Sequence, residues 1–275
     1  MPYFTNQEGY KIFYEDIDEN KGNGTLILLH GFASSVSFFR EQIRVLKEYY
    51  RIIAFDALGH GKSDHPKKLD LAQNLRYEII RDLEDLLNHL KVTDPFGIIG
   101  HSLVGGMIGQ LFSMKHPRKV KYLILLNSGY IMIDNVIRSS FYNLLPYLVR
   151  MNFLDVVAES VEIILDKILP YLRTALVTSM NGAKIELNKL DMLIEEQIFQ
   201  MIKEIKKYDP SAIHCPTLII GGRLDNFAPE AMSEELHKKI PTSKLEIIDM
   251  AGHFAPSQRK EIINELICEF IKDLK

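Results

Sequence analysis

The sequence predicts an α/β protein with a mostly parallel, doubly wound sheet flanked by helices, and two observations support this prediction. Short apolar runs recur along the chain, and each is followed by a turn and a longer segment with helical spacing. Runs that are apolar throughout are typical of parallel strands covered on both faces. Regular alternation of such strands with helices favours a doubly wound sheet. The predicted strands are 25–30, 51–56, 96–100, 121–127, 217–222 and 244–249.

The elements around these strands follow from residue spacing. Residues 8–18 precede the first buried strand and alternate between apolar and polar, which predicts an antiparallel hairpin at an edge of the sheet. Apolar residues recur at helical spacing in 74–91 and in 229–240, which predicts one helix in each segment. These helices connect parallel strands in the predicted fold.

The alternation of strands and helices stops within residues 129–209, which have helical periodicity and no convincing strand. We therefore divide the chain into a core of 1–128 and 210–275 and a helical insertion of 129–209. We expect the insertion to form a cap, or lid, that shapes and dries a pocket over the strand ends. The alternative is that these helices only cover the sheet.

Composition and charge indicate a protein that acts on small molecules. A net charge of −3 gives no basic surface for nucleic acid, and no apolar run approaches the roughly 20 residues that span a bilayer. The N-terminal residues have no basic segment followed by an apolar one, so no secretory signal is expected. Cys215 and Cys268 are expected to be buried thiols rather than a disulfide. We expect a cytoplasmic protein, and its oligomeric state stays open.

The segment "GIIGHSLVGGMIG" at 97–109 combines a buried strand, a tight turn at 100–102 and a helix of small residues. A strand-to-helix turn of this kind holds a serine clear of the sheet, here Ser102, and the backbone N–H of Leu103 can point at a developing oxyanion. A serine hydroxyl is a weak nucleophile and needs a neighbouring base. On its own, the pattern is common and favours a structural glycine turn over a catalytic one.

An acid and a histidine follow later strands. Asp225 comes after the strand at 217–222, and His253 comes after the strand at 244–249. Because parallel strands end at one edge of the sheet, both side chains are expected beside Ser102. There a histidine can act as general base, and a carboxylate can orient it. Taken alone, Asp225 also fits a helix N-cap and His253 a loop histidine.

The sequence "HGF" at 30–32 follows the first buried strand. The backbone N–H of Phe32 is placed to donate a second hydrogen bond to the same oxyanion. A structural role is favoured for His30. The glycine-containing stretch at 59–63 resembles the end of a phosphate-binding loop, but Asp56 stands where the first glycine is needed. The histidines and cysteines show no metal-ligand spacing, so we expect no metal.

Jointly, the motifs resemble those of the α/β-hydrolase superfamily, in its capped, esterase-like branch. The resemblance covers nearly the whole chain and rests on "HGF" at 30–32, "DALGHGKSD" at 56–64, "GHSLVGG" at 100–106, "PTLIIGGRLD" at 216–225 and "AGHF" at 251–254. It implies the α/β-hydrolase fold with an inserted helical cap. It also implies Ser102 as nucleophile, Asp225 as acid and His253 as base. The oxyanion hole would be formed by the backbone N–H groups of Phe32 and Leu103, and Asp56 would have a structural role.

The chain departs from the family pattern at Val104. In the family the serine is followed by one residue and then two glycines, whereas here Gly105 and Gly106 arrive one position late. An extra residue in a helix rotates all later residues by about 100° unless a bulge absorbs it. We therefore predict a bulge or widened turn near 104–106, and a regular α-helix over 103–115 would contradict this prediction.

The resemblance implies a serine hydrolase that cleaves carboxylic esters, or lactones, of small to medium acyl groups through an acyl-enzyme, without cofactor or metal. Ser102 excludes the relatives that use an aspartate nucleophile. Hydrolysis of a C–C bond, a thioester or an amide stays open, because related sites perform these reactions. A further alternative is a ligand-binding protein with low turnover, which only the predicted widened turn supports.

Overall fold

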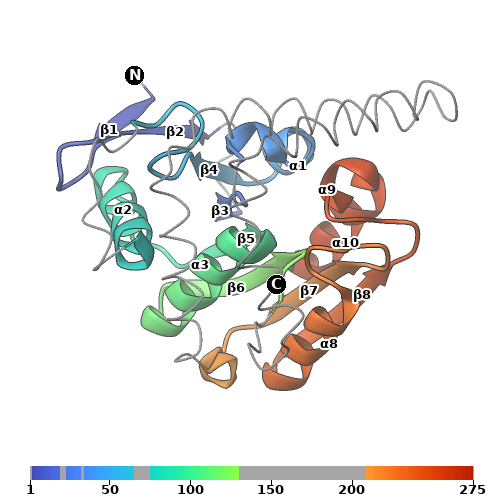
Figure 1. The fold of residues 1–275 in the computed structure, drawn as a ribbon. Helices are drawn as coiled ribbons and strands as arrows, with labels where there is room; N and C mark the ends of the chain where they lie inside the picture. The colour runs from blue at the N-terminus through green and yellow to red at the C-terminus, as the bar shows by residue number, and fades with distance from the viewer. Residues whose placement is uncertain (1, 19–22, 32–33, 65–74, 130–208, 275) are drawn as a thin grey trace, which may run out of the picture.

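The computed structural model of the protein describes residues 2–18, 23–31, 34–64, 75–129 and 209–274, with only the backbone placed at 75–78 and 103. The predicted cap at 129–209 therefore lies outside the described residues, except at its two ends. The described residues form an eight-stranded sheet in the order β1-β2-β4-β3-β5-β6-β7-β8 (Figure 1). Its strands are β1 (Tyr3–Thr5), β2 (Lys11–Ile17), β3 (Thr25–Leu29), β4 (Arg51–Phe55), β5 (Phe96–His101), β6 (Val120–Leu126), β7 (Thr217–Gly222) and β8 (Ser243–Ile248).

All six predicted apolar strands are confirmed, as β3 to β8, and they pair in parallel. Both faces of the sheet are covered over β3 to β7, which explains why these strands are mostly apolar. At the edge, β8 alternates and exposes Lys244 and Glu246. In β3, for example, Leu26 and Leu28 pack into the core on one face, whereas Ile27 and Leu29 pack into the core on the other. The mostly parallel α/β architecture is therefore as the sequence predicts.

Helices cover the two faces of the sheet. Helices α2, α3 and α8 contribute to the core on one face, and α1, α9 and α10 contribute to the core on the other (Figure 1). The helices are η1 (Val36–Phe39), α1 (Arg40–Leu46), α2 (Leu75–His89), α3 (Ser102–Lys115), η2 (Pro210–Ala212), α8 (Glu230–Lys239), α9 (Ala255–Gln258) and α10 (Lys260–Lys272). The two helices predicted at 74–91 and 229–240 correspond to α2 and α8.

The antiparallel edge is confirmed, but its boundaries differ from the prediction. β2 pairs antiparallel with β1 and with β4, and Tyr3 lies opposite Phe13. Residues 8–18 thus supply only one strand of the hairpin. The other strand, β1, is three residues long, which is too short for alternation to be recognised.

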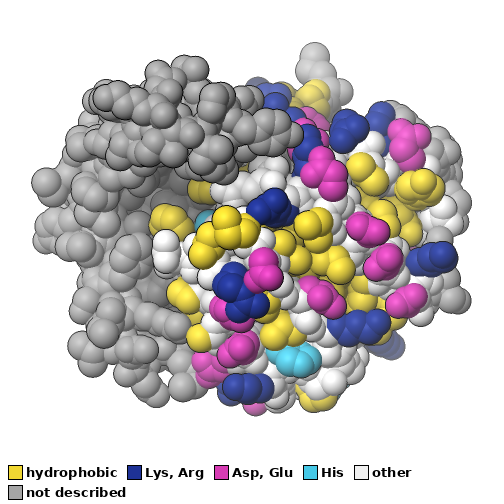
Figure 2. All heavy atoms as spheres, turned by 90° about the vertical axis from the view of Figure 1, so that its right-hand side faces the viewer, with side chains coloured by type: hydrophobic (Ala, Val, Ile, Leu, Met, Phe, Trp, Pro, Cys, Tyr) yellow, Lys and Arg dark blue, Asp and Glu magenta, His cyan; other side chains and the backbone are white. Residues whose placement is uncertain are grey.

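The surface beside β8 mixes charges of both signs with apolar side chains (Figure 2). Arg223 pairs there with Asp249 at 2.5 Å and with Glu230 at 2.9 Å, and Lys244 lies 3.4 Å from Asp273. Of the helices that the structure describes, none has the length and apolar character needed to cross a membrane.

A buried carboxyl group lies between the hairpin and α2. Asp82 is fully buried, and its Oδ1 accepts a hydrogen bond from the Asn6 amide at 2.8 Å. Burial raises the pKa of Asp82 to about 7, although the Asn6 hydrogen bond opposes this shift. The folded protein therefore keeps a proton between pH 3.8 and about 7 that the unfolded chain has lost. The contribution of Asp82 to the free energy of unfolding is fully present below pH 3.8 and is lost as the pH rises to about 7.

Replacing Asp82 with asparagine is expected to raise the free energy of unfolding at pH 8 by about 2–4 kcal/mol, because the buried negative charge disappears while the acceptor for Asn6 stays. Urea unfolding at pH 4 and pH 8 measures the effect, which we expect to be small at pH 4. The matched control is Asp85→Asn on the same helix, since Asp85 is only half-buried. Equal pH dependence in wild type and Asp82→Asn would contradict the prediction.

Candidate active site

Three of the predicted site residues lie together at one edge of the sheet. Ser102 directly follows β5, whereas Asp225 and His253 follow β7 and β8. These strands are parallel and stand close together in the sheet, with β6 between β5 and β7. Their carboxyl ends therefore meet where α/β sheets bind ligands.

The three side chains form a continuous chain of hydrogen bonds. His253 Nδ1 lies 2.8 Å from Asp225 Oδ2, and His253 Nε2 lies 2.9 Å from Ser102 Oγ. Because the ionised carboxylate only accepts hydrogen bonds, Nδ1 carries the proton and donates it. Nε2 is then the acceptor for the serine hydroxyl. This is the geometry in which an imidazole can take a proton from a nucleophile.

Each carboxylate oxygen of Asp225 accepts two hydrogen bonds. Oδ1 accepts from the backbone N–H groups of Phe227 and Ala228, each at 2.8 Å. Oδ2 accepts from His253 and from the Asn127 amide. Burial raises the pKa of Asp225, but these hydrogen bonds outweigh burial and leave the pKa below its ordinary value. Asp225 is therefore ionised at neutral pH and fixed in orientation.

Ser102 occupies a tight turn. Its φ is +62°, in the left-handed region that non-glycine residues seldom adopt. Helix α3 begins at this residue, so the backbone N–H of Leu103 belongs to the first turn, where N–H groups are free and the helix dipole is positive. A Cβ at Gly31 would lie 2.8 Å from the Ser102 Cβ, so only glycine fits there.

The predicted bulge or widened turn near 104–106 is wrong. Residues 102–115 form one continuous α-helix, α3. The extra residue is taken up by regular helix, and Val104 turns inward and packs in the core with 6% of its surface exposed.

The positions of the two glycines explain why no bulge is needed. In the regular helix, a Cβ at Gly105 would lie 2.1 Å from the carbonyl oxygen of Leu29, and a Cβ at Gly106 would lie 2.0 Å from Ser128 Oγ. The glycines therefore face the ends of β3 and β6, where the helix approaches the sheet most closely. Although the two glycines come one position later than in the family pattern, they lie where the helix comes closest to the sheet.

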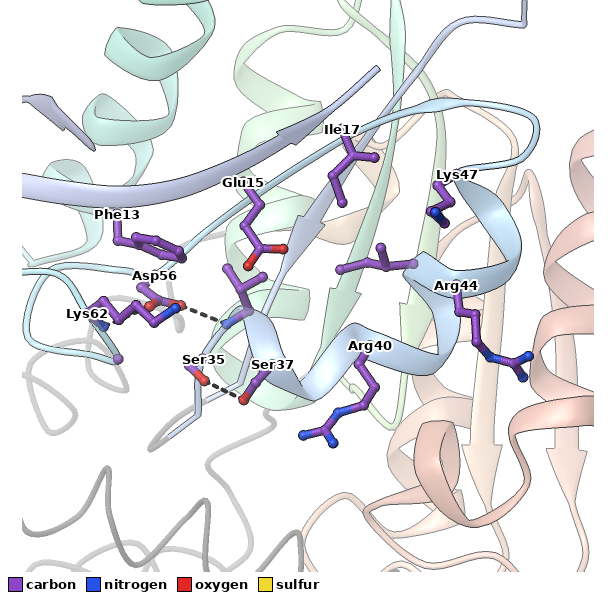
Figure 3. Close-up of a pocket in the computed structure, with 13 residues that line it drawn as sticks. Phe13, Glu15, Ile17, Ser35, Ser37, Arg40, Arg44, Lys47, Asp56 and Lys62 are labelled. Carbon is purple, nitrogen blue, oxygen red and sulfur yellow. Dashed lines mark hydrogen bonds between the residues drawn. The ribbon is translucent and has the colours of Figure 1, made fainter. Parts of the chain in front are cut away.

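The segment expected to supply the second oxyanion donor is anchored at both ends. Phe32 itself lies outside the described residues. Before it, His30 Nε2 accepts from the backbone N–H of Ala57 at 3.0 Å, and Nδ1 donates to the Gly31 carbonyl at 2.7 Å. After it, Asp56 Oδ1 accepts from the backbone N–H of Val36 at 2.7 Å (Figure 3).

These contacts give both anchoring side chains structural roles, as the sequence predicts. Burial lowers the pKa of His30 to about 4, so the ring is neutral. Asp56 also accepts from the backbone N–H of Lys62 at 2.8 Å. Asp56 borders a hollow between β2 and α1 whose rim includes Glu15 and Arg40 (Figure 3). Ser102, Asp225 and His253 do not line this hollow.

Sequence reasoning missed two residues that contact the site. Asn127, at the end of β6, donates to Asp225 Oδ2 at 2.9 Å. His101, at the end of β5, lies with Nε2 3.0 Å from the carbonyl oxygen of His253 and so donates to it; burial and the nearby His253 lower its pKa to about 3. The available signal was a polar residue directly after an apolar strand, at the edge where ligands bind.

The two cysteines lie apart from this site and are not paired. Cys215 and Cys268 are free thiols that are half-buried, not fully buried as predicted, and this burial raises the pKa of both. Within the described ranges, His, Cys, Asp and Glu side chains form no group of three or more that could hold a metal ion.

Comparison with known proteins agrees with this fold. Residues 24–259 match the family model described as alpha/beta hydrolase fold. The uncharacterized hydrolase YugF of Bacillus subtilis is 29% identical, over 96% of this chain and 96% of its own.

Two solved structures share the fold. A thermophilic esterase from Thermogutta terrifontis superposes with a TM-score of 0.76 at 22% identity, over 99% of this chain and 98% of its own. The enol-lactonase from Burkholderia xenovorans LB400 superposes with a TM-score of 0.73 at 20% identity, over 98% of this chain and 100% of its own.

Proposed function

The chain belongs to the α/β-hydrolase fold family, and from this premise we propose that it is a serine hydrolase that cleaves carboxylic esters or lactones of small to medium acyl groups. Ser102 is the nucleophile, His253 is the general base and acid, and Asp225 orients His253. The observation that carries the proposal is the hydrogen-bonded chain Ser102–His253–Asp225, with separations of 2.9 and 2.8 Å.

The proposed reaction has two stages. Ser102 Oγ attacks the ester carbonyl while its proton passes to His253 Nε2, and the tetrahedral oxyanion is held by the backbone N–H groups of Leu103 and Phe32. His253 then gives the proton to the leaving alkoxide, and the acyl-enzyme forms. Water repeats the sequence and releases the acid. Every group used belongs to the chain, so the proposal requires no metal or cofactor.

The substrate class has two supports. Leu224 and Phe227 are exposed apolar side chains beside the site, and the Phe227 ring centroid lies 5.1 Å from that of His253. Apolar surface at a reaction centre suits an acyl or alkyl group. The related structures include an esterase and an enol-lactonase. We further propose that 129–209 forms the helical cap over this edge and that the enzyme works in the cytoplasm.

The low-turnover ligand-binding alternative loses its one support, because α3 has no widened turn. A panel of short p-nitrophenyl esters and lactones, together with labelling by a fluorophosphonate, tests the hydrolase proposal. We expect turnover and stoichiometric labelling at Ser102. Neither turnover nor labelling across the panel would refute it.

The rate of hydrolysis is expected to fall as the pH drops below neutral. A protonated imidazole has no free lone pair on Nε2, so it cannot take the Ser102 proton. Asp225 stays ionised through this range because its pKa is lowered. A pH–rate profile between pH 4 and 9 measures the effect. A profile flat down to pH 4 would argue against His253 as the base.

A further inference from the structure

Asn127 lies between the elements that carry the three site residues. It follows β6, which pairs with β5 on one side and with β7 on the other. The side chain is fully buried, and the backbone N–H donates to the carbonyl oxygen of Ile220 at 2.7 Å. Its φ of +48° is left-handed, a conformation that asparagine tolerates better than most residues. Asn127 is therefore held rigidly by the sheet.

The amide group of Asn127 connects two loops. Nδ2 donates to Asp225 Oδ2 at 2.9 Å and to the carbonyl oxygen of Gly252 at 3.0 Å. Gly252 immediately precedes His253, and Asp225 lies on the loop after β7. Both hydrogens of one NH₂ group are thus used, one on the acid and one on the backbone next to the base.

This bridge fixes the oxygen that orients the imidazole. Asp225 Oδ2 accepts from Asn127 and from His253 Nδ1 at once. The other side of the histidine is held by His101, which donates to the His253 carbonyl oxygen. A neutral amide is the fitting group at position 127, because it supplies two donors and brings no charge beside the carboxylate.

We infer that Asn127 is a positioning residue for the hydrolytic reaction, because it bridges Asp225 and the backbone beside His253 and so fixes the imidazole relative to Ser102. This inference rests on the proposed function. Asn127 acts through Asp225 and His253, so its loss is expected to slow the chemical step and to leave substrate binding nearly unchanged.

Two variants separate this role from a general structural one. Asn127→Gly removes both hydrogen bonds and tolerates the left-handed backbone. Asn127→Asp keeps the shape and the tolerance of positive φ but replaces the donors by a carboxyl group. The matched control is Asn6→Ala, since Asn6 is also a buried asparagine that donates to a buried aspartate, Asp82, far from the site in the fold.

Asn127→Gly is expected to lower kcat about 10- to 100-fold, as small displacements of a reacting group do, and to change KM less than about threefold. Asn6→Ala is expected to lose stability with kcat unchanged within about twofold. Equal kcat in wild type and Asn127→Gly, or an equal loss in Asn6→Ala, would overturn the inference.

The pH profile of Asn127→Asp gives a second readout. Among the described residues, the titratable groups linked to this position are Asp225, His253, which donates to Asp225, and His101, which donates to the His253 carbonyl oxygen. Two carboxyl groups at hydrogen-bond distance share a proton. While the shared proton is bound, the new carboxyl can still donate to Asp225; once it leaves, two carboxylates repel each other. We expect the activity of Asn127→Asp relative to wild type to fall with rising pH. A constant ratio would contradict the bridge.

A third measurement does not depend on turnover. Proton NMR of the His253 Nδ1–H resonance reports its hydrogen bond to Asp225 in any folded variant. We expect this resonance to shift or broaden in Asn127→Gly and Asn127→Asp and to stay unchanged in Asn6→Ala. If wild type shows neither turnover nor labelling while the resonance responds in this way, the proposed function fails and the bridge stands. An unchanged resonance in both Asn127 variants refutes the bridge, whatever the activity.

Discussion

Replacing Ser102 with alanine is expected to lower ester hydrolysis by roughly 10,000-fold or more, because no other group at the site can form the acyl-enzyme. The change removes one oxygen and leaves the hydrogen bond between His253 and Asp225 in place. Binding is therefore expected to survive, and labelling by a fluorophosphonate is expected to disappear. Initial rates with a p-nitrophenyl ester, together with the melting temperature of each variant, measure the effect.

The matched control is Ser113→Ala. Ser113 is a buried serine on the same helix, and its hydroxyl donates to the Gly109 carbonyl at 2.7 Å. This control is expected to keep wild-type kcat within about twofold, because the hydrogen bonds that it removes, to the Gly109 carbonyl and to the Cys215 thiol, include none to Ser102, Asp225 or His253. A Ser102→Ala protein that retains a tenth of the wild-type rate would show that another nucleophile performs the reaction.

Replacing Gly105 with alanine is expected to lower the free energy of unfolding by about 3 kcal/mol or more. In a helix interior, alanine ordinarily stabilises a protein by about 1 kcal/mol relative to glycine. A loss of stability in Gly105→Ala would therefore be opposite in sign to the usual effect. Here the new Cβ would lie 2.1 Å from the Leu29 carbonyl oxygen and 2.6 Å from that of His30. Backbone atoms cannot rotate away, and α3 would have to shift relative to β3.

Gly109→Ala serves as the control on the same helix. Its Cβ would meet side-chain ends, Leu123 Cδ1 at 3.1 Å and Ile98 Cγ2 at 3.2 Å, which can move by small rotations. Urea unfolding of both variants is expected to show a loss below about 1 kcal/mol for Gly109→Ala. If Gly105→Ala is as stable as wild type, the close approach of α3 to the end of β3 is not as described.

Most of the sheet could be predicted because a strand that is buried on both faces is a nearly continuous run of apolar residues in the sequence. β3 to β7 are mostly apolar and buried, and β8 still carries three apolar residues, and the order of these strands along the chain places Ser102, Asp225 and His253 after three different strands. Parallel strands end at one edge, so topology alone brings these side chains together. The short β1 has no such pattern, and its pairing with β2 is visible only in the structure.

Two features of the site could not be predicted, for a common physical reason. The sequence marks Asn127 only as a polar residue after an apolar strand, because an amide acquires its role through its contacts, here with Asp225 and Gly252. The direction in which Gly105 and Gly106 face depends on Leu29 and Ser128, which lie on other parts of the sheet. The spacing of residues along a helix determines the angle between their side chains, but it does not determine which residues of other elements they contact.

The placement of the 129–209 segment between two paired strands has a consequence for engineering. β6 and β7 are direct neighbours and run parallel, with Leu123 opposite Thr217, so the chain leaves the sheet at the carboxyl end of β6 and returns to it at the amino end of β7. Exchanging residues 130–208 for a segment from another protein would leave every paired residue of the described sheet in place. Such a graft should begin after Gly129, because Asn127 belongs to the site and a Cβ at Gly129 would lie 2.5 Å from the Met232 Cβ. On the proposal that 129–209 forms the cap, such a graft would change the substrate range and leave Ser102, Asp225 and His253 in place.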